Sequence, residues 1–205
     1  MKKTIIELNN PFESETELTV RKIDLLPESH PILRKEPLPW SFDPPQADPE
    51  VMHHVMLENM VYHHGLGLSA NQIGMPVKVF AMRVDDAGNA IVCFNPKITK
   101  VSDETVTMKE GCLSFPSLYL NIRRPQGVKA EYQNMDGDMI SVSFEGLAAR
   151  IFHHEMDHMK GATFISKVSK FFLQNARRKQ RTLLRKARKD GSRIPYWKNW
   201  CWQKS

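Results

Sequence analysis

Long apolar runs are missing from this chain of 205 residues, and cysteine is scarce. No stretch approaches the roughly 18 apolar residues that a membrane span needs, and the opening MKKTIIELNN lacks the continuous apolar segment of a secretory signal. The three cysteines, Cys93, Cys112 and Cys201, are odd in number and far apart, which disfavours a disulfide framework. These absences predict a soluble protein of a reducing cytosol, without a targeting segment or a membrane partner.

Acidic residues are almost absent from the end of the chain. From Lys167 onward there are thirteen Lys and Arg and a single acid, Asp190, whereas residues 1–166 hold 16 of the 29 basic and 22 of the 23 acidic side chains. Hydrophobic residues make up 41% of the chain, which is enough to fill one packed core. A mildly acidic body with a strongly basic tail predicts a polyanionic partner for the tail alone.

Hydrophobic spacing and turn residues predict the order of the elements. Six prolines between residues 31 and 49 indicate an extended surface loop, because proline fixes φ and donates no hydrogen bond. A helix is expected from Pro49 to Gly65 and another from about Glu145. Strand patterns lie between them at residues 77–82, at 90–94 ending at Asn95–Pro96, near Val101 and Val106, and at 128–132 and 140–144 around a hairpin turn at 134–138. This order indicates an α+β fold with small antiparallel or mixed sheets.

The segment HEMDH at residues 154–158 lies in the second predicted helix. A spacing of four places His154 and His158 on one helix face, where they can hold a metal ion beside Glu155 as an acid or base. Two histidines at this spacing can also arise by chance on a surface helix. Here the neighbouring residues are apolar, and burying an unpaired histidine pair would be costly. His153 and Asp157 are expected to support the site, with His153 alternatively on the surface.

Two histidines leave a tetrahedral metal site incomplete, so a third protein ligand is needed. Zinc peptidases with this motif take the third ligand from downstream, but after His158 the chain has no further His or Glu. The third ligand is therefore expected upstream. Cys112 is the strongest candidate by residue type, with Glu110 and the other histidines as alternatives. A lone cysteine is also often no more than a small buried residue.

The glycine-rich segment GLGLSA at residues 65–70 formally matches a dinucleotide-binding fingerprint. That fingerprint requires a strand before it and a helix after it, whereas here a predicted helix precedes and Pro76 soon follows. We reject the dinucleotide interpretation. Instead, we expect a loop whose bare backbone can pair with an extended substrate, with Gln72 directing a donor into the site. The alternative is an ordinary turn with Gln72 on the surface.

Three segments in this order resemble the motifs of the peptide deformylase family: GLGLSANQ at residues 65–72, EGCLS at 110–114 and HEMDH at 154–158. The Asn95–Pro96 pair and the lead-in GLAAR at 146–150 are also similar, and the resemblance covers about Arg21 to Ile165. It implies an enzyme that removes the formyl group from the N-terminal methionine of nascent chains. It also implies small antiparallel sheets that enclose the metal-binding helix.

The resemblance implies that Cys112, His154 and His158 hold one divalent metal ion. In the family this ion is natively Fe²⁺, with Zn²⁺ or Ni²⁺ as replacements. The metal would lower the pKa of a bound water, and Glu155 would take the proton of that water and pass it to the leaving amine.

Further roles follow from the same resemblance. The side chain of Gln72 and the backbone N–H of Leu113 would stabilise the developing oxyanion. Recognition of N-formylmethionyl peptides would rest on backbone pairing and on an apolar pocket for the methionine side chain. Tyr119 stands where some members carry an arginine, which leaves the contacts to later peptide residues open. The residues expected to contact the substrate are Leu66, Gly67, Glu110, Gly111, Leu147 and Ile151.

The basic tail contains apolar residues at helical spacing up to Gly191, followed by a segment with Trp197, Trp200 and Trp202. The helix is expected either to pack on the core with a solvated basic face or to contact ribosomal RNA through phosphates. The tryptophans could stack on bases or fold back onto the body. The organisation expected is a lead-in at 1–20, a catalytic domain at 21–166, and a basic C-terminal helix with a Trp-rich tail at 167–205.

Two other functions compete with deformylation. A metallopeptidase could use the same helix, and it would cleave unformylated peptides. An inactive relative could instead serve as a ribosome- or RNA-binding module, although the complete set of metal-binding residue types argues against it.

Overall fold

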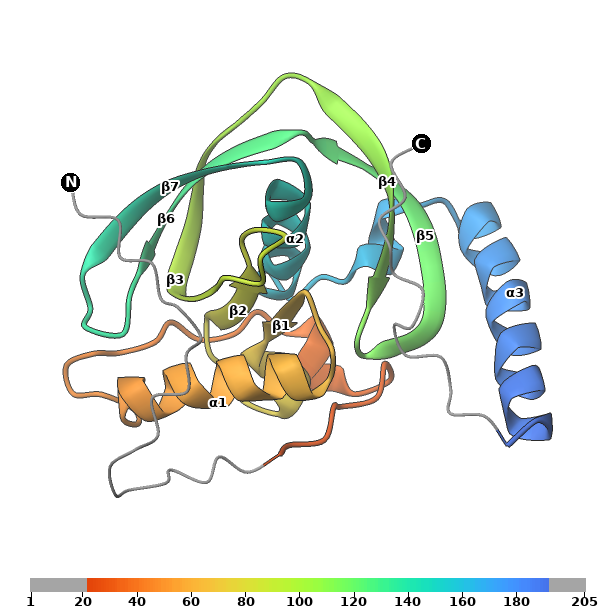
Figure 1. Cartoon of the computed structure of the whole chain (residues 1–205), viewed down its shortest axis with the longest axis horizontal. Helices are drawn as coiled ribbons and strands as arrows, with labels where there is room; N and C mark the ends of the chain where they lie inside the picture. Colours follow the sequence, from red (N-terminus) through yellow and green to blue (C-terminus); the bar gives the residue numbers. More distant parts are fainter. Residues whose placement is uncertain (1–21, 192–205) are drawn as a thin grey trace.

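The computed structural model describes residues 22–191, and these form an α+β fold, as expected from the sequence. Figure 1 shows helix α2 at the centre, with strands arching over it and α1 beneath. The helices and strands are α1 (Pro49–Tyr62), β1 (Gly67–Ser69), β2 (Val79–Arg83), β3 (Ala90–Val101), β4 (Thr105–Cys112), β5 (Phe115–Pro125), β6 (Gly127–Gln133), β7 (Met139–Glu145), α2 (Gly146–His158) and α3 (Lys170–Lys189).

The larger sheet has five strands in the order β1-β2-β3-β6-β7, and every neighbouring pair is antiparallel. β1 lies at the edge of this sheet, where it pairs with β2 through Gly67 opposite Met82. The predicted hairpin at residues 134–138 is confirmed, since Asn134 N–H donates to the Asp138 carbonyl between β6 and β7. Residues 67–69, which the sequence predicts as part of a loop, form the short strand β1 instead.

The prediction that Asn95–Pro96 ends a strand is wrong. β3 continues to Val101, and its pairing with β6 shifts register between Phe94 and Lys97. Asn95 adopts a left-handed φ of 49°, which short polar side chains tolerate better than most, and the resulting bulge accommodates the missing donor of Pro96. The Asn95 side chain also accepts from the Trp40 N–H at 2.7 Å and donates to the Trp40 carbonyl at 2.9 Å, which fixes the proline-rich loop to the sheet.

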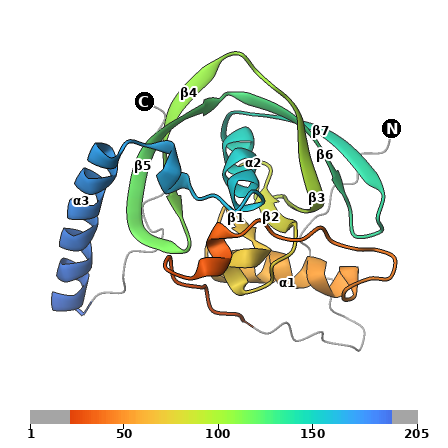
Figure 2. The ribbon, with the colours of Figure 1, turned by 180° about the vertical axis from the view of Figure 1, so that it is seen from behind.

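The second sheet consists of β4 and β5 alone, and sequence reasoning did not identify β5. One face of β5 packs with the segment after α2, where Phe115 and Ile122 lie near Phe164 in a separate apolar cluster. Helix α2 contacts both sheets, so it lies between them, and the view from behind shows the same arrangement (Figure 2). Phe152 of α2 is fully buried against Phe80 of β2.

The predicted first and last helices are confirmed with small changes of bounds. Asp48 caps α1 through its carboxylate, which accepts from the Glu50 N–H at 2.8 Å, and Pro49 occupies the first turn. Helix α3 lies against β5, where the Gln180 side chain donates to the Pro116 carbonyl at 2.7 Å. Among residues 22–191, no helix combines the length and apolarity that a bilayer span would require.

Candidate metal centre and active site

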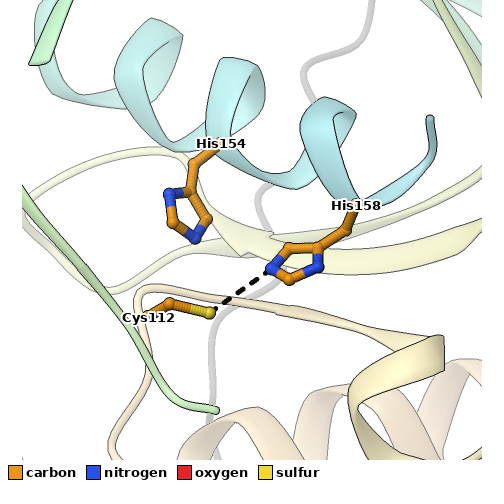
Figure 3. Close-up of side chains that lie close together, drawn as sticks. All are labelled: Cys112, His154 and His158. Atoms are coloured by element: carbon orange, nitrogen blue, oxygen red, sulfur yellow. Dashed lines mark hydrogen bonds between the residues drawn. The ribbon is translucent and has the colours of Figure 1, made fainter. Parts of the chain in front are cut away.

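Helix α2 carries the two histidines of the HEMDH segment on one face. Their spacing of four residues places the ring centroids of His154 and His158 5.5 Å apart. Figure 3 shows both rings turned toward Cys112, which ends β4 on the neighbouring sheet. The Sγ atom of Cys112 lies 3.4 Å from Nε2 of His158, and one ligand atom from each of the three residues lies within 4.8 Å of the others.

This donor set fits one divalent metal ion. A sulfur and a nitrogen bound to one tetrahedral ion, at about 2.3 and 2.1 Å, lie roughly 3.5 Å apart, close to the observed separation. His154 uses Nδ1 to contact Glu110 at 3.1 Å, which leaves its Nε2 for the ion. Burial disfavours the charged form of the His158 imidazole and lowers its pKa to about 3. One thiolate with two imidazoles is typical of zinc and iron sites.

Glu155 lies beside the three candidate ligands and is almost fully buried. The Ser69 hydroxyl donates to Oε2 of Glu155 at 2.6 Å, and burial raises the pKa of the carboxyl group. The other oxygen lies against Gly67, where an added Cβ would come 2.9 Å from the Glu155 carboxyl carbon and 3.0 Å from Ile151. Only glycine at position 67 lets the backbone of β1 approach Glu155 this closely.

Gln72 directs its amide group into the same cavity. Its Oε1 accepts from the Ser69 N–H at 2.9 Å, and this contact fixes the orientation of the carboxamide. Its Nε2 then points toward Cys112 Sγ at 3.4 Å and Ser114 Oγ at 3.2 Å. Gln72 is buried and is therefore not the surface residue of an ordinary turn.

Behind His154 lies a buried charge network that sequence reasoning did not find. Glu110 accepts two hydrogen bonds from Arg124, at 2.7 and 2.8 Å, and one from Arg150 at 2.7 Å. Burial opposes ionisation of Glu110, but the hydrogen bonds from Arg124 and His154 outweigh it and lower the pKa of Glu110. Glu110 is thus a carboxylate that holds a candidate metal ligand, and it lies outside the ligand cluster itself.

The network continues to the far side of α2. Arg124 also donates to Asp157 at 2.9 Å, and Lys167 contacts the other oxygen of Asp157 at 2.9 Å. Asp157 therefore supports the helix structurally. His153 is buried, which excludes the surface position considered for it, and burial together with Arg124 lowers its pKa to about 4.

Arg124→Met is expected to destabilise the protein strongly. The substitution removes one of the cations paired with the buried carboxylates of Glu110 and Asp157, and breaking a buried pair costs about 3–5 kcal/mol. Arg123→Met is a matched control, because the adjacent Arg123 is exposed and donates a hydrogen bond to the Thr105 hydroxyl at the surface. It should change the free energy of unfolding by less than about 0.5 kcal/mol. Urea unfolding of both variants measures the difference, and equal midpoints would show that the network contributes little.

A cavity opens beside these groups. Of the six residues expected to contact substrate, five line it, and Leu147 does not; Leu147 packs instead at the edge of the core between α2 and the larger sheet. Arg150 also lines the cavity, and sequence reasoning did not identify it. The lining residues are Leu66, Gly67, Gln72, Glu110, Gly111, Cys112, Leu113, Arg150, Ile151, His154 and Glu155.

Known proteins similar to this chain are peptide deformylases, both in sequence and in structure. The family model for polypeptide deformylase matches residues 22–172. A peptide deformylase of Thermotoga petrophila is 38% identical over 140 residues, which is 68% of this chain and 82% of the relative. A chloroplastic/mitochondrial peptide deformylase 1B of Arabidopsis thaliana is 39% identical over 134 residues, 64% of this chain and 49% of the relative. The crystal structure of peptide deformylase from Thermotoga maritima superimposes with a TM-score of 0.67 at 34% identity, covering 73% of this chain and 99% of that one.

Proposed function

This chain belongs to the polypeptide deformylase family, and we propose that its Cys112–His154–His158 site hydrolyses the N-formyl group of nascent chains and releases formate. The observation that carries the proposal is the convergence of one thiol and two imidazoles beside Glu155 and Gln72 in a single cavity. The enzyme is a metal-dependent hydrolase that acts on a linear amide.

Cys112, His154 and His158 would hold one divalent ion, for which we propose Fe²⁺ with Zn²⁺ or Ni²⁺ as replacements. The anionic thiolate supports this assignment, because soft sulfur ligands suit iron and zinc better than Mg²⁺ or Ca²⁺. When bound, the ion would polarise the formyl oxygen and lower the pKa of a water toward neutrality. The same thiol would make the site sensitive to peroxide.

Glu155 would act as the proton carrier of the reaction. Its Oε2 is held by Ser69, so the proton would be accepted from the attacking water at Oε1, the oxygen beside Gly67. The same oxygen would then deliver the proton to the leaving amine. The Gln72 amide group and the backbone N–H of Leu113 would stabilise the negative charge that develops on the formyl oxygen, since both residues line the cavity.

Recognition of the peptide would use the open edge of β1. Within residues 22–191 the edge strand Gly67–Ser69 pairs with β2 alone, so its outer side can receive an extended peptide by backbone hydrogen bonds. Leu66, Leu113 and Ile151 give the cavity an apolar wall suited to the methionine side chain. Glu110 and Gly111 border the same space. Backbone pairing suits an enzyme that accepts many sequences after the first residue.

Formate release separates this function from its competitors. We expect the metal-loaded protein to release formate from formyl-Met-Ala and to leave unformylated Met-Ala-Ser intact. Cleavage of the unformylated peptide at a comparable rate would favour a metallopeptidase. No turnover of either peptide would favour an inactive binding module.

The exposed side of α3 supports a ribosomal partner. This helix contains nine Lys and Arg and no Asp or Glu. Arg178, Arg181 and Arg185 are exposed and recur at three and four residues, which places them on one stripe of the helix. We propose that this stripe contacts phosphates of ribosomal RNA near the emerging substrate. The bacterial and chloroplastic/mitochondrial relatives support a site of action in a bacterial cytosol or an organelle, and a virus-infected host cytosol stays an untested alternative.

Neutralising this stripe should weaken ribosome binding in a salt-dependent manner. Each phosphate contact contributes about 0.7–0.9 to the slope of log affinity against log salt, so Arg178→Gln/Arg181→Gln/Arg185→Gln should reduce the slope by roughly 2–3. Lys97→Gln/Lys100→Gln/Lys129→Gln, on the exposed side of β3 and β6, is the charge-matched control and should leave the slope unchanged. Cosedimentation with ribosomes at several salt concentrations measures the slope for both triple variants. Identical slopes would refute the proposal that Arg178, Arg181 and Arg185 contact RNA phosphates.

A further inference from the structure

A second hollow of about 750 Å³ lies between β5 and α3, and it shares no lining residue with the catalytic cavity. Six apolar or aromatic residues line it, together with Lys109, Lys179 and three uncharged polar residues. Tyr119 and Leu120 of β5 form one wall, and Phe172, Ala176 and Leu183 of α3 form the other. Lys109 Nζ lies 5.0 Å from the centroid of the Tyr119 ring. We call this hollow the β5–α3 groove.

The groove has two features of an unfilled binding surface. Phe172 is 63% exposed and Leu183 is 41% exposed, although both line it, and large apolar side chains in a hollow favour an apolar occupant. Ser117 also lines the groove; it is 6% exposed, and its hydroxyl has no hydrogen-bond partner among the described residues.

We propose that the occupant is the C-terminal segment of this same chain, residues 192–205, which lies outside the described part. Residues 194–205 of this segment have the sequence IPYWKNWCWQKS, which contains four aromatic residues. Burial of a large aromatic surface is stabilising. Tryptophan also brings an indole N–H that seeks an acceptor when buried, and the Ser117 hydroxyl is an acceptor inside the groove. The terminal carboxylate would be drawn to Lys109 or Lys179.

The segment is long enough to reach the whole groove. Helix α3 ends at Lys189, and its rise of about 1.5 Å per residue places Leu183 roughly 9 Å and Phe172 roughly 26 Å back along the helix. Fourteen residues in extended conformation span up to about 46 Å. The segment can therefore fold back along α3 while the stripe of Arg178, Arg181 and Arg185, which does not line the groove, stays exposed.

Cys201 provides a reporter within the segment, between Trp200 and Trp202. The other two cysteines, Cys93 and Cys112, are buried, and mass spectrometry of peptides identifies which thiol has reacted. In the full-length native protein, a maleimide should modify Cys201 at least about tenfold more slowly than in urea, as expected for a docked segment that opens locally. Phe172→Ser should raise the native rate about tenfold by removing apolar surface from the groove.

Phe171→Ser is the matched control, because Phe171 is 65% exposed like its neighbour but does not line the groove. It should change the rate of Cys201 modification less than about twofold. If Phe172→Ser fails to fold, Leu183→Ser serves as a second variant of the groove and should have the same effect on the rate. Circular dichroism shows whether each variant keeps helix α3. A native rate equal to that in urea, or equal acceleration by both phenylalanine variants, would overturn the proposal. So would protection that appears only when a ribosomal RNA fragment is added, which would assign the groove to RNA.

Discussion

Glu155→Gln is expected to lower kcat/KM for formyl-Met-Ala by about 10²–10⁴, the range that a positioned acid or base contributes. The amide keeps the shape of the carboxylate beneath Gly67 and can keep a contact with the Ser69 hydroxyl. It cannot accept and return a proton. The metal content should stay at that of the wild type, because Glu155 is not one of the three converging ligand residues. Formate release and metal analysis on the same preparation test both parts.

The control for this substitution is Glu145→Gln, which makes the same chemical change at the exposed residue preceding α2. It should leave kcat/KM within about twofold of the wild type. A Glu155→Gln protein that retained metal and nearly full activity would show that the proton is carried elsewhere. Loss of activity only in proportion to loss of metal would assign Glu155 a structural part.

Cys112→Ala is expected to abolish both tight metal binding and formate release. Two imidazoles would remain, and a metal site normally needs three protein ligands. Loss of a partner that merely orients a ligand already costs about 10–100-fold in metal affinity, so loss of the thiolate should cost more than about 100-fold. Competition with a chromophoric chelator measures the affinity.

Cys93→Ala is the matched control for the thiol. Cys93 is fully buried in β3, where burial raises its pKa, and it belongs to the apolar core beside the larger sheet. The variant should lose some stability and keep its metal. If Cys112→Ala bound metal as tightly as the wild type, the third ligand would have to lie elsewhere, and Glu110 would be the next residue to replace.

The parts of the site that follow from short-range geometry could be predicted from sequence. The spacing of four in α2 fixes where His154 and His158 point, because helical periodicity is local. Because no His or Glu follows His158, the third ligand is expected upstream, where Cys112 is the strongest candidate by residue type, and the structure places its Sγ beside both rings. The role of Gln72 in stabilising the oxyanion is predicted only by the resemblance to the peptide deformylase family, which rests on the order of the three motifs.

The buried network could not be predicted, because it depends on contacts between distant segments. Arg124 and Arg150 lie 14 and 40 residues from Glu110 in sequence, and nothing near either arginine marks it as a buried partner. β5 was missed although its burial alternates from Leu118 to Pro125, with Leu118, Leu120 and Ile122 turned inward, as expected of a half-buried strand. Only the burial of Arg124 in that series depends on contacts between distant segments.

Asn95–Pro96 illustrates how tertiary contacts override a local signal. Proline after asparagine usually ends a strand, because proline cannot donate to the sheet. Here the Asn95 side chain bonds both the N–H and the carbonyl of Trp40, and the bulge lets β3 resume its pairing with β6 at Lys97. Leu147 lies outside the lining of the cavity, because its half-buried side chain packs against the core beside the larger sheet, and its contact with the substrate stays a prediction.

The most direct test of the central claim is formate release by anaerobically prepared protein that carries one metal ion per chain. With formyl-Met-Ala as substrate, the geometry of Cys112, His154, His158, Glu155 and Gln72 predicts stoichiometric formate and free Met-Ala over many turnovers. Removal of the ion by a chelator should stop the reaction, and its return should restore it. Folded, metal-loaded protein that released no formate would contradict the assignment.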